Sequence, residues 1–445
     1  STADPYVKKV WDGRYTGIRM CNELLENIDR VPDLDPELKK RYIGEAKVLR
    51  AYNYYELYTK FGDVPYTTKV LSIKESMSIA RTAKATVIAN VLADLDEVIN
   101  GNYLPTSYDA DNKGRITRWA AMAIKAKIYL FEGNWTQVKN ITSTIMTEGG
   151  FKLFGSYAGL FEIANEYNSE VILDAQYRPT SREHQMMYVF LPPTLGGYSQ
   201  LSPLQELVDS YIMLDGKTIK ETGTSFDESH PYANRDPRLK ATVMYTGNSY
   251  TLADGTEVVI NCEKGEGKDG YGVGSDCSAT GYYIKKYWDN TYRATLYSGL
   301  NPILIRYADI LLMNAEALAE LGELDKTAWD ATIKPIRDRA GFTLASALEF
   351  PEGASKDKLI EIVRNERRSE LALEGHRHKD IIRWRIADNV LNGWCHGLKT
   401  NDVVGTDDGY VRVENRTFNA NKHYLWPIPQ AERDLNGNLE QNPNW

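Results

Sequence analysis

The chain has 445 residues, of which 42% are hydrophobic and 26% are charged, an ordinary composition for a globular protein with a large core. Its formal net charge of −8 argues against a nucleic-acid-binding protein, because that function needs a basic surface. No uninterrupted apolar run approaches the roughly 18 residues of a membrane span. The 29 Tyr and 9 Trp residues against 10 Phe indicate surfaces that are half apolar and half wet.

The first 150 residues are predicted to form a series of helices. Residues 7–28 are amphipathic, and the next helix starts with Asp35 as N-cap and Pro36 at its first position, then runs to Phe61. Further helices are expected at residues 86–99, at 119–131 after the cap residue Thr117, and at 135–148. Ala alternates with Tyr or Trp at the contact positions without a strict period, which indicates a tetratricopeptide-like, repeat-like scaffold.

Residues 151–300 differ from the helical segments on both sides. Short strand-like runs at 171–173 and 258–260 are separated by Gly, Pro, Asn and Asp clusters, and a second helical block follows from Ile303 to Asn389. We therefore predict a mainly α fold with minor β structure and one domain over 1–445. Its scaffold would comprise 1–150 and 301–390, with an irregular ligand-binding insertion at 151–300 and an irregular segment at 391–445.

The densest run of charge, residues 365–384, lies inside a helical pattern. Glu366 and Glu370 continue the three-and-four spacing of Leu359 and Val363, which places their carboxylates in line with an apolar stripe. A buried carboxylate needs a partner, so both are predicted to be ion-paired on a partly buried face. Gly375 is placed like a helix C-cap, with a second short helix near Asp380. The nearest candidate partners in sequence are Arg367, Arg377, Arg383 and Arg385.

This charged run resembles the signature of the SusD/RagB family, roughly Asn-Glu-Arg-Arg-x-Glu-Leu, then Glu-Gly-x-Arg, then an acidic residue and Arg-Trp. Other stretches match the family in its order, at residues 51–66, 114–135, 215–217, 234–238, 305–316, 336–341, 426–429 and 441–443. The resemblance implies scaffold rather than ligand-binding roles in this run, and ion-pair networks on half-buried helices are more often structural than catalytic. The residues concerned are Glu366, Arg367, Arg368, Glu370, Glu374, Gly375, Arg377, Asp380, Arg383 and Trp384.

The resemblance also implies a function. Members of this family are surface-exposed outer-membrane lipoproteins that bind oligosaccharides or polysaccharides and work with a TonB-dependent, SusC-like transporter. It implies a lipid anchor N-terminal to Ser1, no cofactor and no catalysis. Two alternatives stay open: capture of peptides or another nutrient by the same type of complex, and a helical-repeat scaffold with protein partners only.

Several short motifs suggest chemistry that their surroundings do not support. Residues 265–270 satisfy GxGxxG, but no helix can start directly afterwards, so a flexible loop is expected. Residues 109–114 begin like a calcium loop, but Ala120 stands where a bidentate Glu belongs, so a turn is expected. No motif selects a metal site or a pair of catalytic carboxylates. Cys262 and Cys277 flank the Gly-rich loop as either a disulfide or two free thiols.

Aromatic residues crowd the segment 282–297 and supply the candidate ligand contacts. Rings can take the flat face of a sugar, and Asn, Asp or Arg can bind its hydroxyl rim. Tyr282, Tyr283 and Tyr287 are expected to pack the loop, whereas packing and ligand binding both stay open for Trp288 and Tyr292. In the family, the region 67–81 often contacts ligand, but here it has no aromatic residue after Tyr66. The predicted ligand contacts are Trp288, Tyr292, Tyr297, Asn290, Tyr66 and Arg81.

Overall fold

The structure is a computed structural model that describes residues 1–291 and 296–445, so Tyr292 lies outside the described residues. It confirms a mainly α fold with minor β structure. Internal contacts divide the chain into two compact units. Unit 1 comprises residues 1–149, 378–391 and 418–445, and unit 2 comprises residues 150–377 and 392–417. The single-domain organisation stays a prediction.

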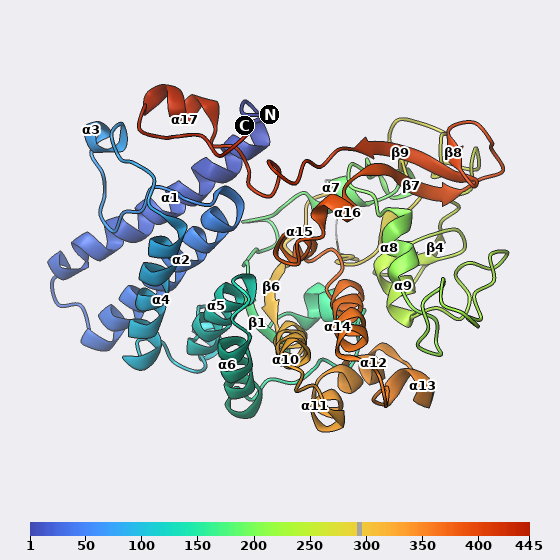
Figure 1. Cartoon of the computed structure of the whole chain (residues 1–445), viewed down its shortest axis with the longest axis horizontal. Helices are drawn as coiled ribbons and strands as arrows, with labels where there is room; N and C mark the ends of the chain where they lie inside the picture. The colour runs from blue at the N-terminus through green and yellow to red at the C-terminus, as the bar shows by residue number, and fades with distance from the viewer. Residues whose placement is uncertain (292–295) are drawn as a thin grey trace. The chain divides into compact units, whose positions relative to one another are not determined.

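Unit 1 begins with helices, most of which pack against another helix close by in the sequence (Figure 1). As predicted, Asp35 and Thr117 accept backbone N–H groups at the starts of α2 and α5. In α2, buried side chains lie on every side of the helix, including Tyr54, Tyr58 and Phe61, so α2 is the centre of this unit. The helices are α1 (Pro5–Asn27), α2 (Pro36–Phe61), α3 (Ile73–Ser76), α4 (Lys84–Asn100), α5 (Arg118–Phe131) and α6 (Trp135–Glu148), with 3₁₀ turns at Ile28–Arg30 and Ala110–Asn112.

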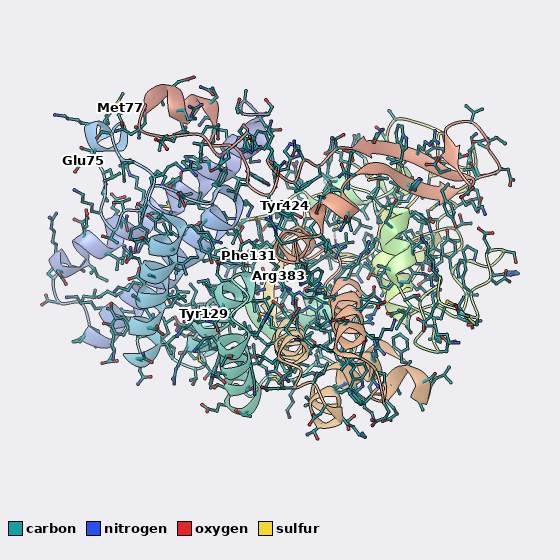
Figure 2. The ribbon with its side chains drawn as sticks, in the orientation of Figure 1. Glu75, Met77, Tyr129, Phe131, Arg383 and Tyr424 are labelled. Atoms are coloured by element: carbon teal, nitrogen blue, oxygen red, sulfur yellow. The ribbon has the colours of Figure 1, made fainter. Side chains whose placement is uncertain are left out.

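Segments late in the chain complete unit 1. They include α15 (Arg377–Arg383), α16 (Ala387–Val390) and α17 (Gln430–Leu435). Ile381 and Ile382 of α15 pack with Phe131 at the end of α5 and with Tyr424, and Figure 2 labels both of these aromatic residues. No helix within residues 1–291 and 296–445 has the length and apolar character that a membrane crossing requires.

Unit 2 is built around one strand pair and the helices that follow it. β1 (Val171–Asp174) pairs antiparallel with β6 (Ile303–Arg306), and α10 (Tyr307–Leu321) then packs against α14 (Lys356–Glu370) and α12 (Ile333–Ala340). The helix predicted to begin at Ile303 therefore begins at Tyr307. Hydrophobic periodicity does not distinguish a short buried strand from the start of a helix. Residues 303–306 form a strand because their backbone pairs with β1. The other helices are α7 (Met186–Phe190), α8 (Gln205–Ser210), α9 (Pro237–Thr242), α11 (Lys326–Ala331) and α13 (Ala345–Leu348), with 3₁₀ turns at Gly159–Phe161, Ile163–Asn165 and Pro193–Leu195.

Small sheets complete unit 2. β2 (Val243–Met244) pairs with β5 (Tyr283–Ile284), and β3 (Ser249–Thr251) pairs with β4 (Glu257–Val259). β7 (Gly393–Lys399), β9 (Tyr410–Arg416) and β8 (Thr406–Asp407) form a three-stranded sheet in that order (Figure 1).

The prediction that residues 391–445 are irregular is wrong, because they hold this sheet and α17. The overlooked signal is Asp408-Gly409, whose φ angles of 49° and 86° form the two-residue turn between β8 and β9. Such an Asp-Gly pair is a strong short-range hairpin signal, because both central residues need positive φ.

The signature helix also ends earlier than predicted. α14 stops at Glu370, so Gly375, with φ 79°, is not its C-cap. The Glu370 carbonyl oxygen accepts hydrogen bonds from Arg306 Nη2 at 2.8 Å and from the Tyr157 hydroxyl at 3.1 Å. Side chains thus satisfy a terminal carbonyl that a further helical turn or a glycine cap otherwise satisfies.

Candidate functional site

The signature glutamates lie in a buried ion network inside unit 2. Arg238 Nη1 lies 2.8 Å from Glu370 Oε2, Arg306 Nη1 lies 2.7 Å from Glu370 Oε1, and Arg339 also contacts this carboxylate. Glu366 pairs with Arg238 at 2.7 Å and with Arg337 Nε at 2.7 Å. Both glutamates are buried, as their place in the apolar stripe predicted.

The arginines nearest in sequence are not the ones that bind these two carboxylates. Their ion pairs come from α9, β6 and α12, whereas Arg367 pairs with Asp309 of α10 at 2.6 Å. Adjacent residues on a helix point in different directions, so Arg367 cannot share the face of Glu366. Arg383 pairs with Asp380 at 2.9 Å in unit 1.

Glu374 extends the network to Lys286. Its carboxylate accepts hydrogen bonds from Arg306 Nε at 2.8 Å and from Lys286 Nζ at 2.7 Å. Burial alone raises the pKa of Glu374, but Arg306 and Lys286 outweigh it and lower the pKa to about 2. Burial lowers the pKa of Lys286 to about 8 against the opposite effect of Glu374. A carboxylate held this strongly in its charged form is a poor proton carrier near neutral pH. The scaffold role of the network stays a prediction.

The predicted aromatic loop is partly a packing element. Tyr282, Tyr283 and Tyr287 are buried, which confirms their expected packing role. Trp288 is half-buried: its ring packs on Tyr250 at a centroid distance of 4.9 Å, and its Nε1 donates to the Thr251 carbonyl at 2.9 Å.

Two further residues of this loop face solvent. Asn290 is exposed, and Tyr297 is 42% exposed with its hydroxyl accepting a hydrogen bond from Gln185 Nε2 at 2.9 Å. Ligand contact by Trp288, Asn290 and Tyr297 stays a prediction.

Arg81 ties the exit of α2 to the last residues of the chain. Its guanidinium donates to the carbonyls of Asp63 at 2.8 Å, Phe61 at 3.2 Å and Glu440 at 2.9 Å, and to Asn442 Oδ1 at 2.5 Å. Arg81 is about 360 residues from Glu440 and Asn442 in the sequence, so the sequence alone does not predict these contacts. The guanidinium has therefore a structural role, and its ligand contact stays a prediction.

Tyr66, the other candidate at the exit of α2, is half-buried against Tyr54. The centroids of the two rings lie 4.7 Å apart. One face of the Tyr66 ring is thus used for packing, and its ligand contact stays a prediction.

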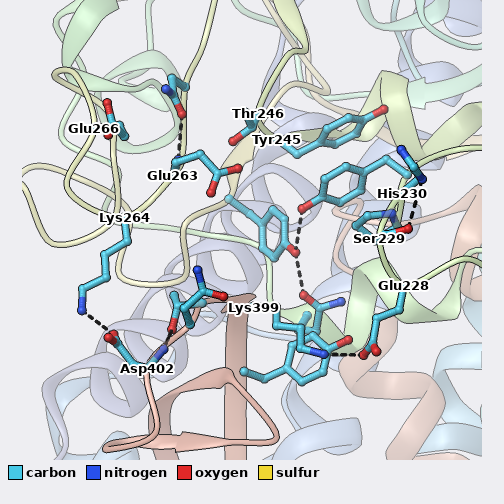
Figure 3. A pocket seen from close by; sticks show the side chains of 18 of the residues that line it. Glu228, Ser229, His230, Tyr245, Thr246, Glu263, Lys264, Glu266, Lys399 and Asp402 are labelled. Atoms are coloured by element: carbon cyan, nitrogen blue, oxygen red, sulfur yellow. Dashed lines mark hydrogen bonds and ion pairs between the residues drawn. The ribbon is translucent and has the colours of Figure 1, made fainter.

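A cavity of about 1070 Å³ opens in unit 2 (Figure 3). Its walls come from the loop 228–233, from the segment 245–266, and from the β7–β9 region at 399–402 and 410. Aromatic rings, side-chain amides and charged groups all line it, which is the mixture expected of a specific ligand pocket. The lining residues include Gln205, Glu228, Tyr232, Tyr245, Thr246, Asn261, Glu263, Lys264, Glu266, Tyr282, Lys399, Asn401, Asp402 and Tyr410.

A stack of tyrosines forms the aromatic wall of this pocket. The rings of Tyr232 and Tyr245 are 4.0 Å apart and inclined by 17°, and both residues are half-buried. The Tyr232 and Tyr282 hydroxyls lie 3.2 Å apart, and Tyr282 donates to Gln205 Oε1 at 2.6 Å. Burial raises the pKa of Tyr245, so its hydroxyl stays protonated near neutral pH. The wall therefore offers ring faces together with fixed hydroxyl groups.

Comparison with known proteins identifies the family. The model described as "SusD family" matches residues 160–445, well over half of the chain. The chain belongs to the SusD family. A second model, described as "Starch-binding associating with outer membrane", matches residues 1–130.

Solved structures and a curated relative agree with this family. A SusD-like carbohydrate-binding protein from Bacteroides fragilis superposes with a TM-score of 0.88 at 29% identity, covering 99% of this chain and 87% of its own. A second SusD-like protein from Bacteroides fragilis gives a TM-score of 0.84 at 29% identity, covering 100% and 87%. SusD-like protein P25 of Formosa agariphila is 28% identical over 409 residues, which are 86% of this chain and 71% of the relative.

One of the SusD-family motifs, residues 234–238, positions the tyrosine wall. Asn234 adopts a positive φ of 54°, and Asp236 caps α9 and pairs with Arg238 at 2.7 Å. Between them, buried Arg235 donates to the carbonyls of Val208 and Pro231, each at 2.7 Å. Arg235 thereby fixes the loop that carries Tyr232. The motif could be identified in the sequence, but nothing in the sequence indicated that it lies beside a pocket.

Another part of the wall, β7, packs closely on the segment that carries Tyr282. Leu398 N donates to the Thr280 carbonyl at 2.7 Å. A Cβ on Gly397 would lie 2.6 Å from that carbonyl oxygen, and one on Gly281 would lie 1.8 Å from Leu398 Cδ2. Glycine is therefore required at both positions for this approach.

His396 of β7 anchors the same sheet. Its Nδ1 lies 2.8 Å from Glu206 Oε1 on α8 and its Nε2 lies 3.0 Å from Asp407 Oδ2 on β8. Burial acts to lower the pKa of His396, but hydrogen bonds to Asp407 and Glu206 outweigh it and raise the pKa. His396 thus ties the β7–β9 wall to α8.

The two cysteines that flank the Gly-rich loop are free thiols, which decides between the two alternatives. Within residues 1–291 and 296–445, no group of three His, Cys, Asp or Glu side chains is arranged to hold a metal ion.

Proposed function

We propose that this SusD-family protein is a non-catalytic glycan-binding protein and that the unit 2 pocket binds an oligosaccharide. The observation that carries the proposal is the Tyr232–Tyr245 stack beside the Tyr282–Gln205 hydrogen bond, all on the wall of one large cavity. One similar structure is described as a carbohydrate-binding protein, which supports the same class of ligand.

The chemistry of the pocket suits a saccharide. Half-buried tyrosine rings can pack against the C–H face of a pyranose, and amide and hydroxyl groups can bind its rim. Asn261 and Asn401 are exposed at the edge and Gln205 lies buried behind the rings. A cavity of about 1070 Å³ is at the upper end of typical ligand pockets, which favours several sugar units over one.

The ion pairs of two of its acids favour binding over hydrolysis. Glu228 pairs with Lys399 at 2.5 Å and Asp402 pairs with Lys264. A glycosidase needs one carboxylic acid held protonated and a second carboxylate free to act as nucleophile or base. Glu228 and Asp402 are instead each engaged by a lysine.

We also propose Trp288, Asn290, Tyr297, Tyr66 and Arg81 as further ligand contacts. Replacing one stacking ring in a site dominated by a few contacts should cost about 1–3 kcal/mol of binding free energy. Tyr245→Ala is therefore expected to weaken oligosaccharide binding about five- to 150-fold in calorimetric titration, and a melting curve checks that the variant stays folded. The ligand is the best binder from a screen of defined oligosaccharides.

Two matched variants give this titration its meaning. Tyr6→Ala removes an exposed ring from unit 1 and should leave affinity unchanged. If Tyr297→Ala abolishes binding while Tyr245→Ala has no effect, the site lies at the predicted aromatic loop and the pocket proposal is wrong.

We further propose that the protein is a surface lipoprotein of the outer membrane that delivers its ligand to a TonB-dependent, SusC-like transporter. The description of the second family model, which names the outer membrane, supports this location. Unit 1 exposes large apolar side chains of the kind that a partner covers: Met20 (68%), Ile73 (81%), Met77 (49%) and Leu435 (61%).

Changing two of these apolar residues tests the partner proposal. Ile73→Asp combined with Met77→Asp should reduce co-purification of the full-length protein with a transporter from native outer membranes, because burying an unpaired charge opposes docking. Val403→Asp, at a similarly exposed residue of unit 2, is the control. A parent protein that purifies alone in a detergent that preserves such complexes contradicts the proposal.

A further inference from the structure

The Gly-rich loop with the GxGxxG pattern forms part of the pocket wall. Asn261 Oδ1 accepts from Glu263 N at 2.9 Å, and Tyr271 N donates to the Cys262 carbonyl at 3.2 Å, which closes the loop at its base. A Cβ on Gly270 would lie 2.3 Å from the Glu266 carbonyl oxygen, so only glycine fits this turn. The loop is thus a defined turn that holds Glu263 and Glu266 at the pocket.

The charges that line the pocket are unbalanced. Glu228, Glu263, Glu266 and Asp402 stand against two lysines, Lys264 and Lys399. Each lysine already has a carboxylate partner, since Lys264 pairs with Asp402 and Lys399 pairs with Glu228 at 2.5 Å.

Both lysines of the pocket are therefore already neutralised by carboxylates of the protein and attract an anionic ligand only weakly. His230, which also lines the cavity, lies 2.8 Å from Asp227 through its Nδ1. Among the pocket residues that the structure describes, Glu263 and Glu266 are the carboxylates with no cationic partner.

Figure 3 shows where Glu263 lies relative to its neighbours in the pocket. Glu263 lies beside Thr246, on the same side as Tyr245, whereas Lys264 extends away from them to Asp402. A ligand stacked on the tyrosine wall therefore meets an unpaired carboxylate and no unpaired ammonium group. An ionised carboxylate accepts hydrogen bonds but cannot donate one.

We propose that this pocket selects uncharged oligosaccharides and rejects glycans that bear carboxylate or sulfate groups. The inference rests on the proposed glycan-binding function and adds the class of glycan. Sugar hydroxyls donate to Glu263 and Glu266, and such charge-assisted bonds are stronger than neutral ones. An anionic sugar instead places like charges a few ångströms from Glu263 and Glu266, which repel it, and salt weakens this repulsion because both carboxylates are exposed.

The test compares two ligands that differ only at the primary carbon of each sugar unit, which carries a hydroxyl in one and a carboxylate in the other. One is the best-binding neutral oligosaccharide from a screen, and the other is the same chain with its primary hydroxyls oxidised to carboxylates. We expect the parent protein to bind the neutral chain and to bind the oxidised chain at least tenfold more weakly. Glu263→Gln combined with Glu266→Gln should reduce the ratio of the two dissociation constants, oxidised over neutral, by about three- to tenfold, because both like charges are removed. Higher salt should narrow the parent's ratio as well.

A control variant separates this local effect from the charge of the whole molecule. Glu352→Gln removes an exposed carboxylate of unit 2 that does not line the pocket, and it should leave the ratio unchanged. Equal or tighter binding of the oxidised chain by the parent overturns the inference while glycan binding itself stands. Absence of binding to every glycan in a panel of neutral and acidic chains overturns the proposed function and the inference together.

Discussion

Replacing Glu370 by alanine is expected to lower the free energy of unfolding by about 3–5 kcal/mol, as found when one member of a buried ion network is removed. Three arginines, Arg238, Arg306 and Arg339, would lose their shared carboxylate in a site that water does not reach. An unpaired buried charge costs more free energy than the lost attraction alone, because its desolvation stays uncompensated. Chemical denaturation followed by circular dichroism measures this loss.

Two further variants define what this result means. Glu352→Ala removes an exposed carboxylate from the same unit and should change stability by less than about 0.5 kcal/mol. Glu370→Gln keeps the shape and part of the hydrogen bonding, so it should fall between the parent and Glu370→Ala. If Glu370→Ala unfolds at the same denaturant concentration as the parent, the network contributes nothing to stability and its scaffold role is refuted.

The same network makes the protein sensitive to acid. Burial raises the pKa of Glu374, but Arg306 and Lys286 lower it from 4.5 to about 2, and three arginines lower the pKa of Glu370 in the same way against its own burial. A carboxylate with a lowered pKa in the folded state stabilises the fold above its unfolded pKa and loses that contribution as the pH falls. The unfolding free energy should therefore be nearly constant from pH 7 to pH 5 and fall steeply from about pH 4.5 to pH 2. One such carboxylate contributes on the order of 2–3 kcal/mol.

Glu374→Gln tests whether Glu374 contributes to acid unfolding, because it removes one carboxylate that titrates between about pH 4.5 and pH 2. The variant should be less stable than the parent at pH 7 yet lose less stability between pH 5 and pH 2, which reduces the slope of stability against pH. An unchanged slope would mean that other carboxylates control acid unfolding. Glu56 in unit 1 is the first alternative, since Lys60 and Lys379 outweigh its burial and lower its pKa.

Local signals in the sequence determined much of the helical scaffold. Asp35-Pro36 and Thr117 mark helix starts because a side-chain oxygen accepts a free backbone N–H within three residues, a bond that needs no distant partner. The burial of Glu366 and Glu370 followed from helical spacing for the same reason, since residues three and four apart share a face. The family signature could likewise be identified from consecutive residues.

Only the tertiary structure decided which groups meet. Glu370 binds Arg238, Arg306 and Arg339, which belong to three separate elements, and Arg81 binds Asn442 at the other end of the chain. Ile303–Arg306 is a strand because β1 supplies its backbone partners. The pocket is the clearest case, because the loops that line it, near residues 230, 263 and 400, are far apart in the sequence. Side-chain spacing along a helix is local, whereas a pocket exists only after packing has brought distant loops together.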